Sequence, residues 1–522
     1  MAEPLAKTYK DHLPAFLFWF FALICLVPWV YIQHQTSVNS DVAWLSICAA
    51  RILEGGSLLQ DCYDSNPPLS ILIYIPYIWL SNALDVPTYD TLFWVTTLWA
   101  GLGVLTTITL LQSFPVFNAI EKRIIALTYL CAVTIIPTIY LSERDHFLAV
   151  MILPFILLQL ALTYGYKTSR MTTVFVLVLG GITLLLKPHY GLIPAFLFLH
   201  RMVVQKRLWV VKDIDLLTLL FLTGVYVGVV LLYFQGFAHI IFPDILQTYL
   251  HYNAPQRTYA TAMPYIVLTV CCLGGVFLLK DHSRSVLQAL GICAGLALVI
   301  YIIQMKGFTY HRLPLYAVLF PLSSVLLFKL VQKPFKRSAP YIFMLVIFAA
   351  SYALSPLRPH YPTHKEYQDN VITRYINTHC AHPCSFYITY ENMDIVSQLA
   401  FYSHNQYATR FPSFWFLANI NALTAENKQA ATLRYARYVA EDINRFSPSL
   451  ILVLSSSPAL DQVKQDDTLM TFFPESPEFE SAISRYTKTD RLTMDRAAFY
   501  KDTPYDFPYM LTWDVYTKVS DE

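Results

Sequence analysis

Charged residues are scarce in this sequence. Asp, Glu, Lys and Arg make up 14% of the 522 residues, whereas soluble globular proteins have about a quarter. Hydrophobic residues reach 56%, and the mean hydropathy is +0.44. A soluble chain of this length is therefore excluded, and the composition indicates an α-helical polytopic membrane protein.

The sequence also lacks a long run of Lys and Arg, and its formal net charge is only +2. No nucleic acid is expected as a partner, because binding to a phosphate backbone needs a basic surface. A phosphate-binding loop, a dinucleotide fingerprint and a zinc-protease helix motif are all absent from the sequence. The soluble enzyme classes that carry these motifs are therefore not indicated.

Twelve apolar stretches alternate with polar residues and are candidate membrane spans. They cover residues 14–33, 68–84, 90–112, 122–141, 145–164, 171–187, 189–203, 214–235, 262–280, 286–305, 312–330 and 340–356. The first contains the apolar run Ala15–Ile32 and has no small-residue cleavage site before the next polar loop. We therefore expect it to be retained as a span.

Basic residues predict the direction of these spans. Five loops are basic, namely Glu121–Arg123, Lys167–Arg170, Arg201–Lys212, Lys280–Arg284 and Lys329–Arg337. The positive-inside rule places them, with the N-terminus, in the cytoplasm, so an even number of spans must precede residue 121. Of the three candidates there, 68–84 is the weakest because its prolines remove helical donors. We interpret it as a broken or interfacial segment, which leaves about eleven spans within a range of ten to thirteen.

The same parity places several polar segments on one outer face of the membrane. These are "SVNSDVAW", "LSERDHFL", "LLKPHYGL", the loop 236–261 and "QMKGFTYHRLP". Ionisable residues at the edge of a membrane are costly and usually functional. A functional site on this outer face is the expectation.

The last 166 residues change in character, because charge density rises and long apolar runs stop. "ARYVAEDINRFSPSLILVLSSSP" predicts a helix, a proline turn and a buried strand at Leu450–Leu454. We expect a transmembrane catalytic domain at 1–356, with an outer loop 34–89 carrying juxtamembrane helices. A small α/β soluble domain at 357–522 is expected on the same outer side.

Two cysteines in the tail, Cys380 and Cys384, lie close together in "HCAHPC". They are compatible with a disulfide in an oxidising compartment, with free thiols, or with a metal site that includes His379 and His382. The spacing leaves these three alternatives open.

Asp41 stands at the start of an amphipathic pattern. Asn39 or Ser40 can cap a helix beginning near Asp41, with an apolar stripe that would lie on the outer membrane surface. The helix dipole favours an ionised carboxylate at that end. Asp41 is therefore either a general base or part of the cap.

Three further clusters each have a structural alternative. Glu143–His146 opens a span and is compatible with an interfacial salt-bridge cluster. Lys187–Tyr190 interrupts an apolar run, where a snorkelling lysine is the alternative. Lys306–Arg312 mixes cations with aromatic residues. Together the clusters suit sugar transfer from a polyprenyl phosphate, in which cations bind the leaving phosphate and one carboxylate takes the proton of the acceptor hydroxyl.

At these residues the chain resembles the GT-C-fold glycosyltransferases, in the bacterial branch related to protein O-mannosyltransferases and to lipid A aminoarabinose and galacturonic acid transferases (glycosyltransferase families 39 and 83). The resemblance covers the membrane part, about 350 residues, through "SDVAWLSICAARILEGG", "YDSNPPLSILIY", "ERDH" and "QMKGFTYHRLPL". It implies that Asp41 is the catalytic carboxylate and that Asp145 is a second functional acid. It also implies a polyprenyl phosphate sugar donor and a periplasmic C-terminal domain that assists acceptor binding.

The chain departs from this family at two positions. Many relatives have two consecutive acids where this chain has Asp41-Val42, and many have a lysine where it has Asn66. Other cations would then bind the phosphate. The expected substrate-binding residues are Arg144, His146, Lys187, His189, Lys306, His311, Arg312 and Asn66. No cofactor follows from the resemblance, and the use of a divalent metal stays open.

The sequence thus predicts a multi-pass glycosyltransferase of the bacterial inner membrane, with its active site in the periplasm. It would move a hexosyl or pentosyl group from the lipid-phosphate donor, with inversion, to a glycolipid such as lipid A or lipopolysaccharide core, to another glycan or to a protein. Membrane lipids are the remaining partners. Two alternatives are a carrier or flippase of the envelope glycan pathway, and a non-catalytic assembly subunit.

Overall fold

A computed structural model describes residues 3–207, 213–248, 253–331, 339–354, 362–380, 384–390, 393–414, 420, 423–456, 476–495 and 510–519. The chain forms two compact units. Unit 1 comprises Met1–Gln35, Leu92–Val227 and Ala254–Leu357, and unit 2 comprises Thr36–Thr91, Gly228–Asn253 and Arg358–Glu522. Residues 36–91 thus group with the C-terminal segment, and the division into domains at residue 356 stays a prediction.

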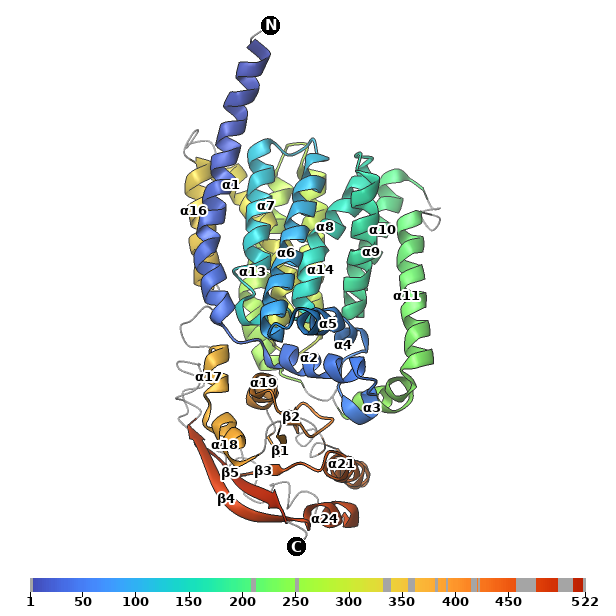
Figure 1. The fold of residues 1–522 in the computed structure, drawn as a ribbon. Helices are drawn as coiled ribbons and strands as arrows, with labels where there is room; N and C mark the ends of the chain where they lie inside the picture. Colours follow the sequence, from blue (N-terminus) through green and yellow to red (C-terminus); the bar gives the residue numbers. More distant parts are fainter. Residues whose placement is uncertain are drawn as a thin grey trace. The chain divides into compact units, whose positions relative to one another are not determined.

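Unit 1 is built from helices (Figure 1). They are α1 (Glu3–Gln35), α6 (Thr88–Gln112), α7 (Ala119–Val133), α8 (Arg144–Tyr164), α9 (Arg170–Leu186), α10 (Leu192–Gln205), α11 (Ile214–Tyr233), α13 (Pro255–Leu278), α14 (Arg284–Ile303), α15 (Leu313–Val331) and α16 (Ala339–Leu354). Helices α6 and α11 cross the boundary between the units. Helix α8 is apolar all round and is buried along nearly its whole length, where it packs against α9, α10 and α15. It therefore forms the centre of the bundle.

Seven helices in the described part of the chain are long and apolar enough to cross a membrane. They are Phe16–Gln35, Thr88–Gln112, Arg144–Tyr164, Ile214–Tyr233, Pro255–Leu278, Arg284–Ile303 and Tyr310–Leu330. Shorter apolar helices occupy Leu69–Leu84, Arg170–Leu186 and Met344–Ala353. The polytopic helical membrane class is confirmed, although several of the eleven expected spans are shorter than the apolar stretches suggested.

Prolines interrupt two of the apolar stretches. The stretch 68–84 is broken into α4 (Leu69–Leu72) and α5 (Ile75–Leu84), as its prolines predicted. The helix expected over 122–141 ends instead at Val133, and a short 3-10 turn follows at Thr138–Tyr140. Pro137 lies between them, and it lacks the amide hydrogen that would continue the helical bonding.

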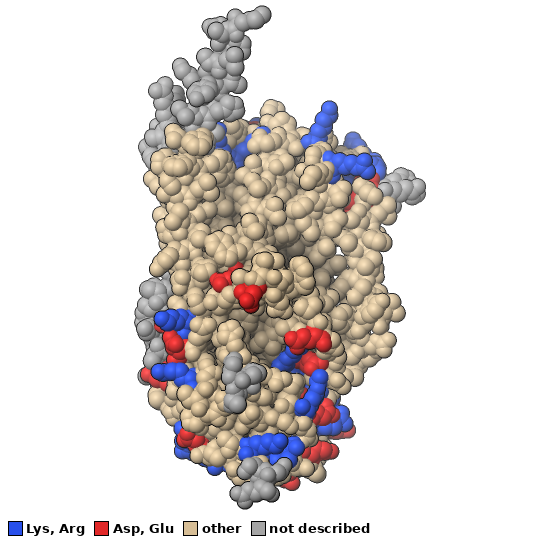
Figure 2. Space-filling view, viewed as in Figure 1, with Lys and Arg blue, Asp and Glu red and all other residues tan. Residues whose placement is uncertain are grey.

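Charge is unevenly distributed over the surface of unit 1. Figure 2 shows a bundle surface that is mostly without Lys, Arg, Asp or Glu, with Lys and Arg gathered at the end that lies at the top of the view. Apolar side chains on this surface include Phe21, Leu98, Phe221 and Val270, each more than 40% exposed. Exposed apolar side chains of this density suit contact with lipid.

Unit 2 combines helices with one mixed sheet (Figure 1). Its helices are α2 (Ser40–Leu53), α3 (Leu58–Asp61), α4, α5, α12 (Phe242–Thr248), α17 (His364–Gln368), α18 (Val371–His379), α19 (Met393–Ser403), α21 (Ala425–Phe446) and α24 (Pro477–Ile483). Its strands are β1 (Ser385–Ile388), β2 (Gln406–Tyr407), β3 (Leu450–Ser456), β4 (Tyr486–Asp495) and β5 (Met510–Lys518).

The sheet has the order β2-β1-β3-β5-β4. Strand β1 pairs in parallel with β2 and β3, whereas β5 pairs antiparallel with β3 and β4. Helix α21 ends at Phe446, and its C-cap residue Ser447 adopts a left-handed conformation just before Pro448. The buried strand β3 then begins at Leu450. The α/β character of the tail and its helix-turn-strand element are therefore confirmed.

Candidate active site

The first turn of α8 positions Asp145 inside the helical bundle. Glu143 is the N-cap of this helix, and its side chain accepts a hydrogen bond from the Arg144 amide at 3.3 Å. Ser142, just before the cap, has a φ of 69°, so the chain turns sharply into the helix. Asp145 is then fully buried. A buried carboxylate needs a compensating partner, because desolvation of an isolated charge is costly.

Lys187 provides that partner from the break between two helices. It follows the last residue of α9, and Pro188 next to it prevents the helix from continuing directly. The Lys187 Nζ lies 3.1 Å from Asp145 Oδ2, and the lysine is only 8% exposed. Lys187 is therefore not a lysine that extends to the membrane surface, which was the alternative interpretation of this residue.

A third break brings His311 to the same place. His311 lies in a 3-10 turn, Tyr310–Arg312, that leads into α15. Its Nε2 lies 3.3 Å from Lys187 Nζ, and the Tyr190 hydroxyl donates to its carbonyl oxygen at 3.3 Å. Asp145, Lys187 and His311 thus form one buried chain of contacts, called here the Asp145–Lys187–His311 cluster.

Further cations surround this cluster. Arg144, His189 and Lys306 all lie near enough to His311 to act on it electrostatically, as Lys187 does. Burial lowers the pKa of the Lys306 ammonium group to about 8. Arg144 also faces Glu143, with the guanidinium Nε 3.8 Å from the carboxylate Oε2.

The balance of charge in this region favours an anion. Arg144, Lys187 and Lys306 are three cations, and Glu143 and Asp145 are two carboxylates, all of them buried. With the histidines neutral, the sum is +1. A phosphate group would be attracted to such a region, because charge-assisted hydrogen bonds are strong where water is excluded.

Two of the expected substrate-binding residues, His146 and Arg312, make their contacts outside the Asp145–Lys187–His311 cluster. His146 is fully buried, and its Nε2 lies 2.8 Å from the Val133 carbonyl oxygen at the end of α7. The Arg312 guanidinium lies over the rings of Tyr265 and Tyr316, at 5.6 and 5.9 Å from their centroids. His146 therefore tethers α8 to α7, and Arg312 makes cation–π contacts with two tyrosines.

Asp41 belongs to unit 2, at the start of α2. Asn39 is the N-cap, and its side-chain oxygen accepts from the Asp41 amide at 2.9 Å, which confirms one of the two expected caps. Asp41 is half-buried in the first turn, where the helix dipole favours its carboxylate.

The apolar stripe of α2 is covered by protein, and the location of this helix at the outer membrane surface stays a prediction. Val42, Leu45 and Ala49 are fully buried, and so is Trp44 outside the stripe. The helix packs against α4, α5 and α19 of its own unit. Protein contacts rather than lipid therefore cover this helix, and a single-helix pattern does not distinguish these two apolar environments.

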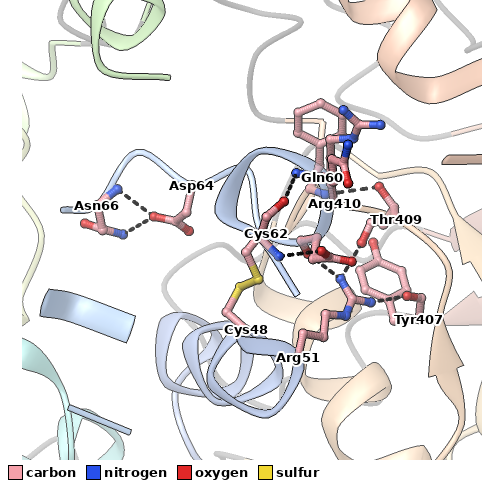
Figure 3. The surroundings of a disulfide bond; sticks show 12 residues. Cys48, Arg51, Gln60, Cys62, Asp64, Asn66, Tyr407, Thr409 and Arg410 are labelled. Carbon is pink, nitrogen blue, oxygen red and sulfur yellow. Dashed lines mark hydrogen bonds between the residues drawn. A yellow bond between two sulfur atoms is a disulfide. The ribbon is translucent and has the colours of Figure 1, made fainter. Parts of the chain in front are cut away.

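Asn66 is fixed by a neighbouring acid. Its amide and its side-chain nitrogen both donate to Asp64 Oδ1, each at 2.6 Å, in a tight local turn (Figure 3). Asp64 is buried and was not among the residues expected from the sequence. Asp64 therefore sets the orientation of the Asn66 side chain.

Sequence reasoning also missed a disulfide. Cys48 and Cys62 are bonded, with their Cα atoms 5.5 Å apart (Figure 3). The available signal was that both cysteines lie outside the twelve apolar stretches, which contain Cys25, Cys131 and others. The Cys380–Cys384 disulfide, one of three alternatives left open, is present.

Among the residues that the structure describes, no three His, Cys, Asp or Glu side chains group together as ligands for a metal ion. His382, which belonged to the metal alternative at Cys380, lies outside the described residues.

No protein-family model matches the chain, and no curated protein matches it. Solved structures do match. ArnT from Cupriavidus metallidurans in the apo state superposes with a TM-score of 0.54 and 12% identity, covering 87% of this chain and 95% of that one. The same protein bound to undecaprenyl phosphate gives a TM-score of 0.52 and 10% identity, covering 96% and 97%.

Arabinofuranosyltransferase AftD from mycobacteria gives a TM-score of 0.49 and 13% identity, covering 95% of this chain and 41% of that one. The chain matches the ArnT structures over nearly its whole length. The chain has the GT-C fold that the sequence resemblance implied.

Proposed function

We propose that this protein is an integral membrane glycosyltransferase that moves a sugar from a polyprenyl phosphate to an envelope acceptor on the periplasmic face of the inner membrane. The observation that carries the proposal is the buried Asp145–Lys187–His311 cluster with Arg144 and Lys306 beside it. These residues give a net positive region, and cations held away from water bind a phosphate strongly.

The reaction class follows from what such a region supplies. The acceptor hydroxyl oxygen attacks the anomeric carbon, and the bond from that carbon to the phosphate oxygen breaks. Polyprenyl phosphate leaves with the electron pair, so the cations stabilise its charge and no acid is needed. We assign the acceptor proton to Asp41 as general base, and the sugar is transferred with inversion.

Lys187 and Lys306 replace the lysine that many relatives have where this chain has Asn66. Lys187 is already paired with Asp145, and we propose that the donor phosphate becomes a second anionic partner of its ammonium. Asp145 then holds Lys187 in place. The ArnT structure bound to undecaprenyl phosphate supports a polyprenyl phosphate as the lipid partner.

The cysteines support a periplasmic location for unit 2. Both disulfides of the described residues lie in this unit, whereas the free cysteines Cys25, Cys131, Cys271, Cys272 and Cys293 all lie in helices of unit 1. Disulfides persist in oxidising compartments such as the bacterial periplasm. This distribution agrees with the basic loops, which independently predict that side for residues 34–89 and 357–522.

Mass spectrometry of envelope glycans and glycolipids tests the proposal. A strain lacking the gene is complemented at matched expression with wild type, with Asp41→Asn or with the control Asp85→Asn. Asp85 is an exposed acid of the same outer loop with a φ of 52°, a conformation that asparagine tolerates. We expect one sugar-sized mass to be lost with the gene and with Asp41→Asn, and to return with wild type and the control.

Other outcomes would select the alternatives. Full restoration by Asp41→Asn would remove Asp41 from the mechanism and favour an assembly subunit. Movement of intact lipid-linked sugar across sealed vesicles, without a new glycosidic bond, would favour a carrier.

A further inference from the structure

The Cys48–Cys62 disulfide joins the two chain segments of unit 2 that carry candidate site residues. Cys48 lies on α2, two helical turns after Asp41, and Cys62 lies directly after α3, two residues before Asp64. Both cysteines are at most 1% exposed. We propose that this disulfide is a positioning cross-link that fixes the segment carrying Asp41, so that efficient sugar transfer depends on formation of the bond. The positioning role rests on the function proposed above.

Arg51 reinforces the same connection. It lies within the covalent loop, about one turn after Cys48, and donates to the carbonyl oxygens of Asp61 at 2.6 Å, of Thr409 at 2.7 Å and of Tyr407 (Figure 3). Burial lowers the pKa of its guanidinium, so holding it there is costly. The fork of N–H donors fits several fixed carbonyls at once, which a lysine does not match.

Further hydrogen bonds and an ion pair fix the segment that leads to Tyr63. The Asp61 carboxylate accepts from the Ser57 amide at 2.7 Å and pairs with Arg445 of α21 at 2.8 Å. The Tyr63 amide donates to the Arg410 carbonyl at 2.7 Å. Chain segments far apart in sequence therefore meet around the disulfide. These contacts fix the position of the residues that directly precede the 64–66 turn.

The second disulfide of unit 2 has none of these features. Cys380 and Cys384 are four residues apart and close a small loop between α18 and β1, away in sequence from every candidate site residue. It lies in the same unit and provides a matched control, because both disulfides depend on the same oxidising environment. A positioning role predicts that, of the two, only the Cys48–Cys62 bond affects the rate of sugar transfer.

Formation of the bond is a two-electron oxidation. The thiols of Cys48 and Cys62 lose two protons and two electrons to an oxidant that itself carries a disulfide, which is reduced to two thiols. Once formed, the bond is shielded from water-soluble reductants by its burial. The folded protein is therefore expected to keep activity in dithiothreitol, while protein made without the oxidant lacks the bond.

The test compares Cys48→Ala/Cys62→Ala with Cys380→Ala/Cys384→Ala and wild type, each purified as the full chain in nanodiscs. Hydrogen exchange of residues 39–66 is measured by mass spectrometry, and transfer is measured with the lipid-linked sugars extracted from the source membranes. For the first variant we expect faster exchange in this segment and a kcat lowered about tenfold or more, equivalent to about 1.4 kcal/mol of activation free energy, with a smaller change in the KM for the donor, because the segment carries Asp41. The control variant should match wild type in both readouts.

A second variant covers the case in which the double substitution fails to fold. Arg51→Gln keeps both cysteines but loses the fork of donors, and the same fall in kcat with little change in the donor KM is expected. Unchanged exchange or an unchanged kcat in these variants would overturn the proposal, as would an equal effect of the control pair. If wild type transfers no sugar, the proposed function fails, whereas the exchange of 39–66 still decides whether the disulfide positions this segment.

Discussion

Substitution of Lys187 should show how much the Asp145–Lys187–His311 cluster contributes to the stability of the fold. The ammonium nitrogen and the carboxylate oxygen are 3.1 Å apart, and both side chains are at most 10% exposed. With an effective dielectric constant of about 20, Coulomb attraction at this distance is about 5 kcal/mol. Lys187→Met keeps most of the volume but leaves Asp145 as a buried charge without its ammonium partner, which typically costs about 3–5 kcal/mol of folding stability.

A double-mutant cycle isolates this interaction. The free energy of unfolding is measured in detergent for wild type, Lys187→Met, Asp145→Asn and the double variant. We expect Lys187→Met to lose about 3–5 kcal/mol and the double variant to lose less than the sum, with a coupling energy of about 3 kcal/mol. The double variant leaves no buried charge at this pair, which is why part of the stability returns.

A more exposed ion pair in the sheet provides the control. Lys488 and Asp514 lie 2.6 Å apart, with 43% and 15% of their side chains exposed. Solvent screens such a pair, so the equivalent cycle with Lys488→Met and Asp514→Asn should give about 1 kcal/mol or less. A coupling energy at Lys187 as small as that of this control would refute the argument that the buried cluster is electrostatically linked.

Two other predictions follow from single residues. Burial lowers the pKa of Lys306 to about 8, so its ammonium is present below that pH and is lost above it. The KM for the donor should therefore rise as pH passes through about 8 in wild type, and it should stay constant in Lys306→Arg, whose side chain keeps its charge. If Lys306→Arg shows the same rise in KM, the titrating group is not Lys306. Asp244 accepts from the hydroxyls of Tyr63 and Tyr435, at 2.5 and 2.6 Å, and pairs with Arg434. Asp244→Asn should lower the stability of unit 2 by about 2–4 kcal/mol, measured by thermal unfolding, and a loss within about 0.5 kcal/mol would contradict this role.

Local elements were predictable from the sequence because their signals are local. The N-cap at Asn39, the break of 68–84 at its prolines and the buried strand at Leu450 each depend on a few neighbouring residues. The end of α7 at Val133 was missed, because an apolar stretch continues beyond Pro137 without being one helix. Hydropathy reports the environment of a stretch but not the continuity of its backbone.

The candidate site was predictable only in part. The sequence placed Asp145, Lys187 and His311 on one face of the membrane but could not show that they touch, since they are 42 and 124 residues apart along the chain. Their contact depends on three helix breaks packing together. The Cys48–Cys62 pairing needed the path of the chain in the same way, although the positions of both cysteines outside the apolar stretches were visible.

Following the lipid itself is the sharpest way to test whether this protein transfers sugar from a polyprenyl phosphate. Purified wild type and Asp41→Asn in nanodiscs are incubated with the lipid-linked sugars and acceptors extracted from the source membranes, and the lipids are analysed by mass spectrometry over time. We expect wild type to convert one polyprenyl phosphate sugar to free polyprenyl phosphate while an acceptor gains the mass of that sugar, and Asp41→Asn to do neither. An unchanged lipid-linked sugar in the presence of wild type, or equal conversion by Asp41→Asn, would contradict it.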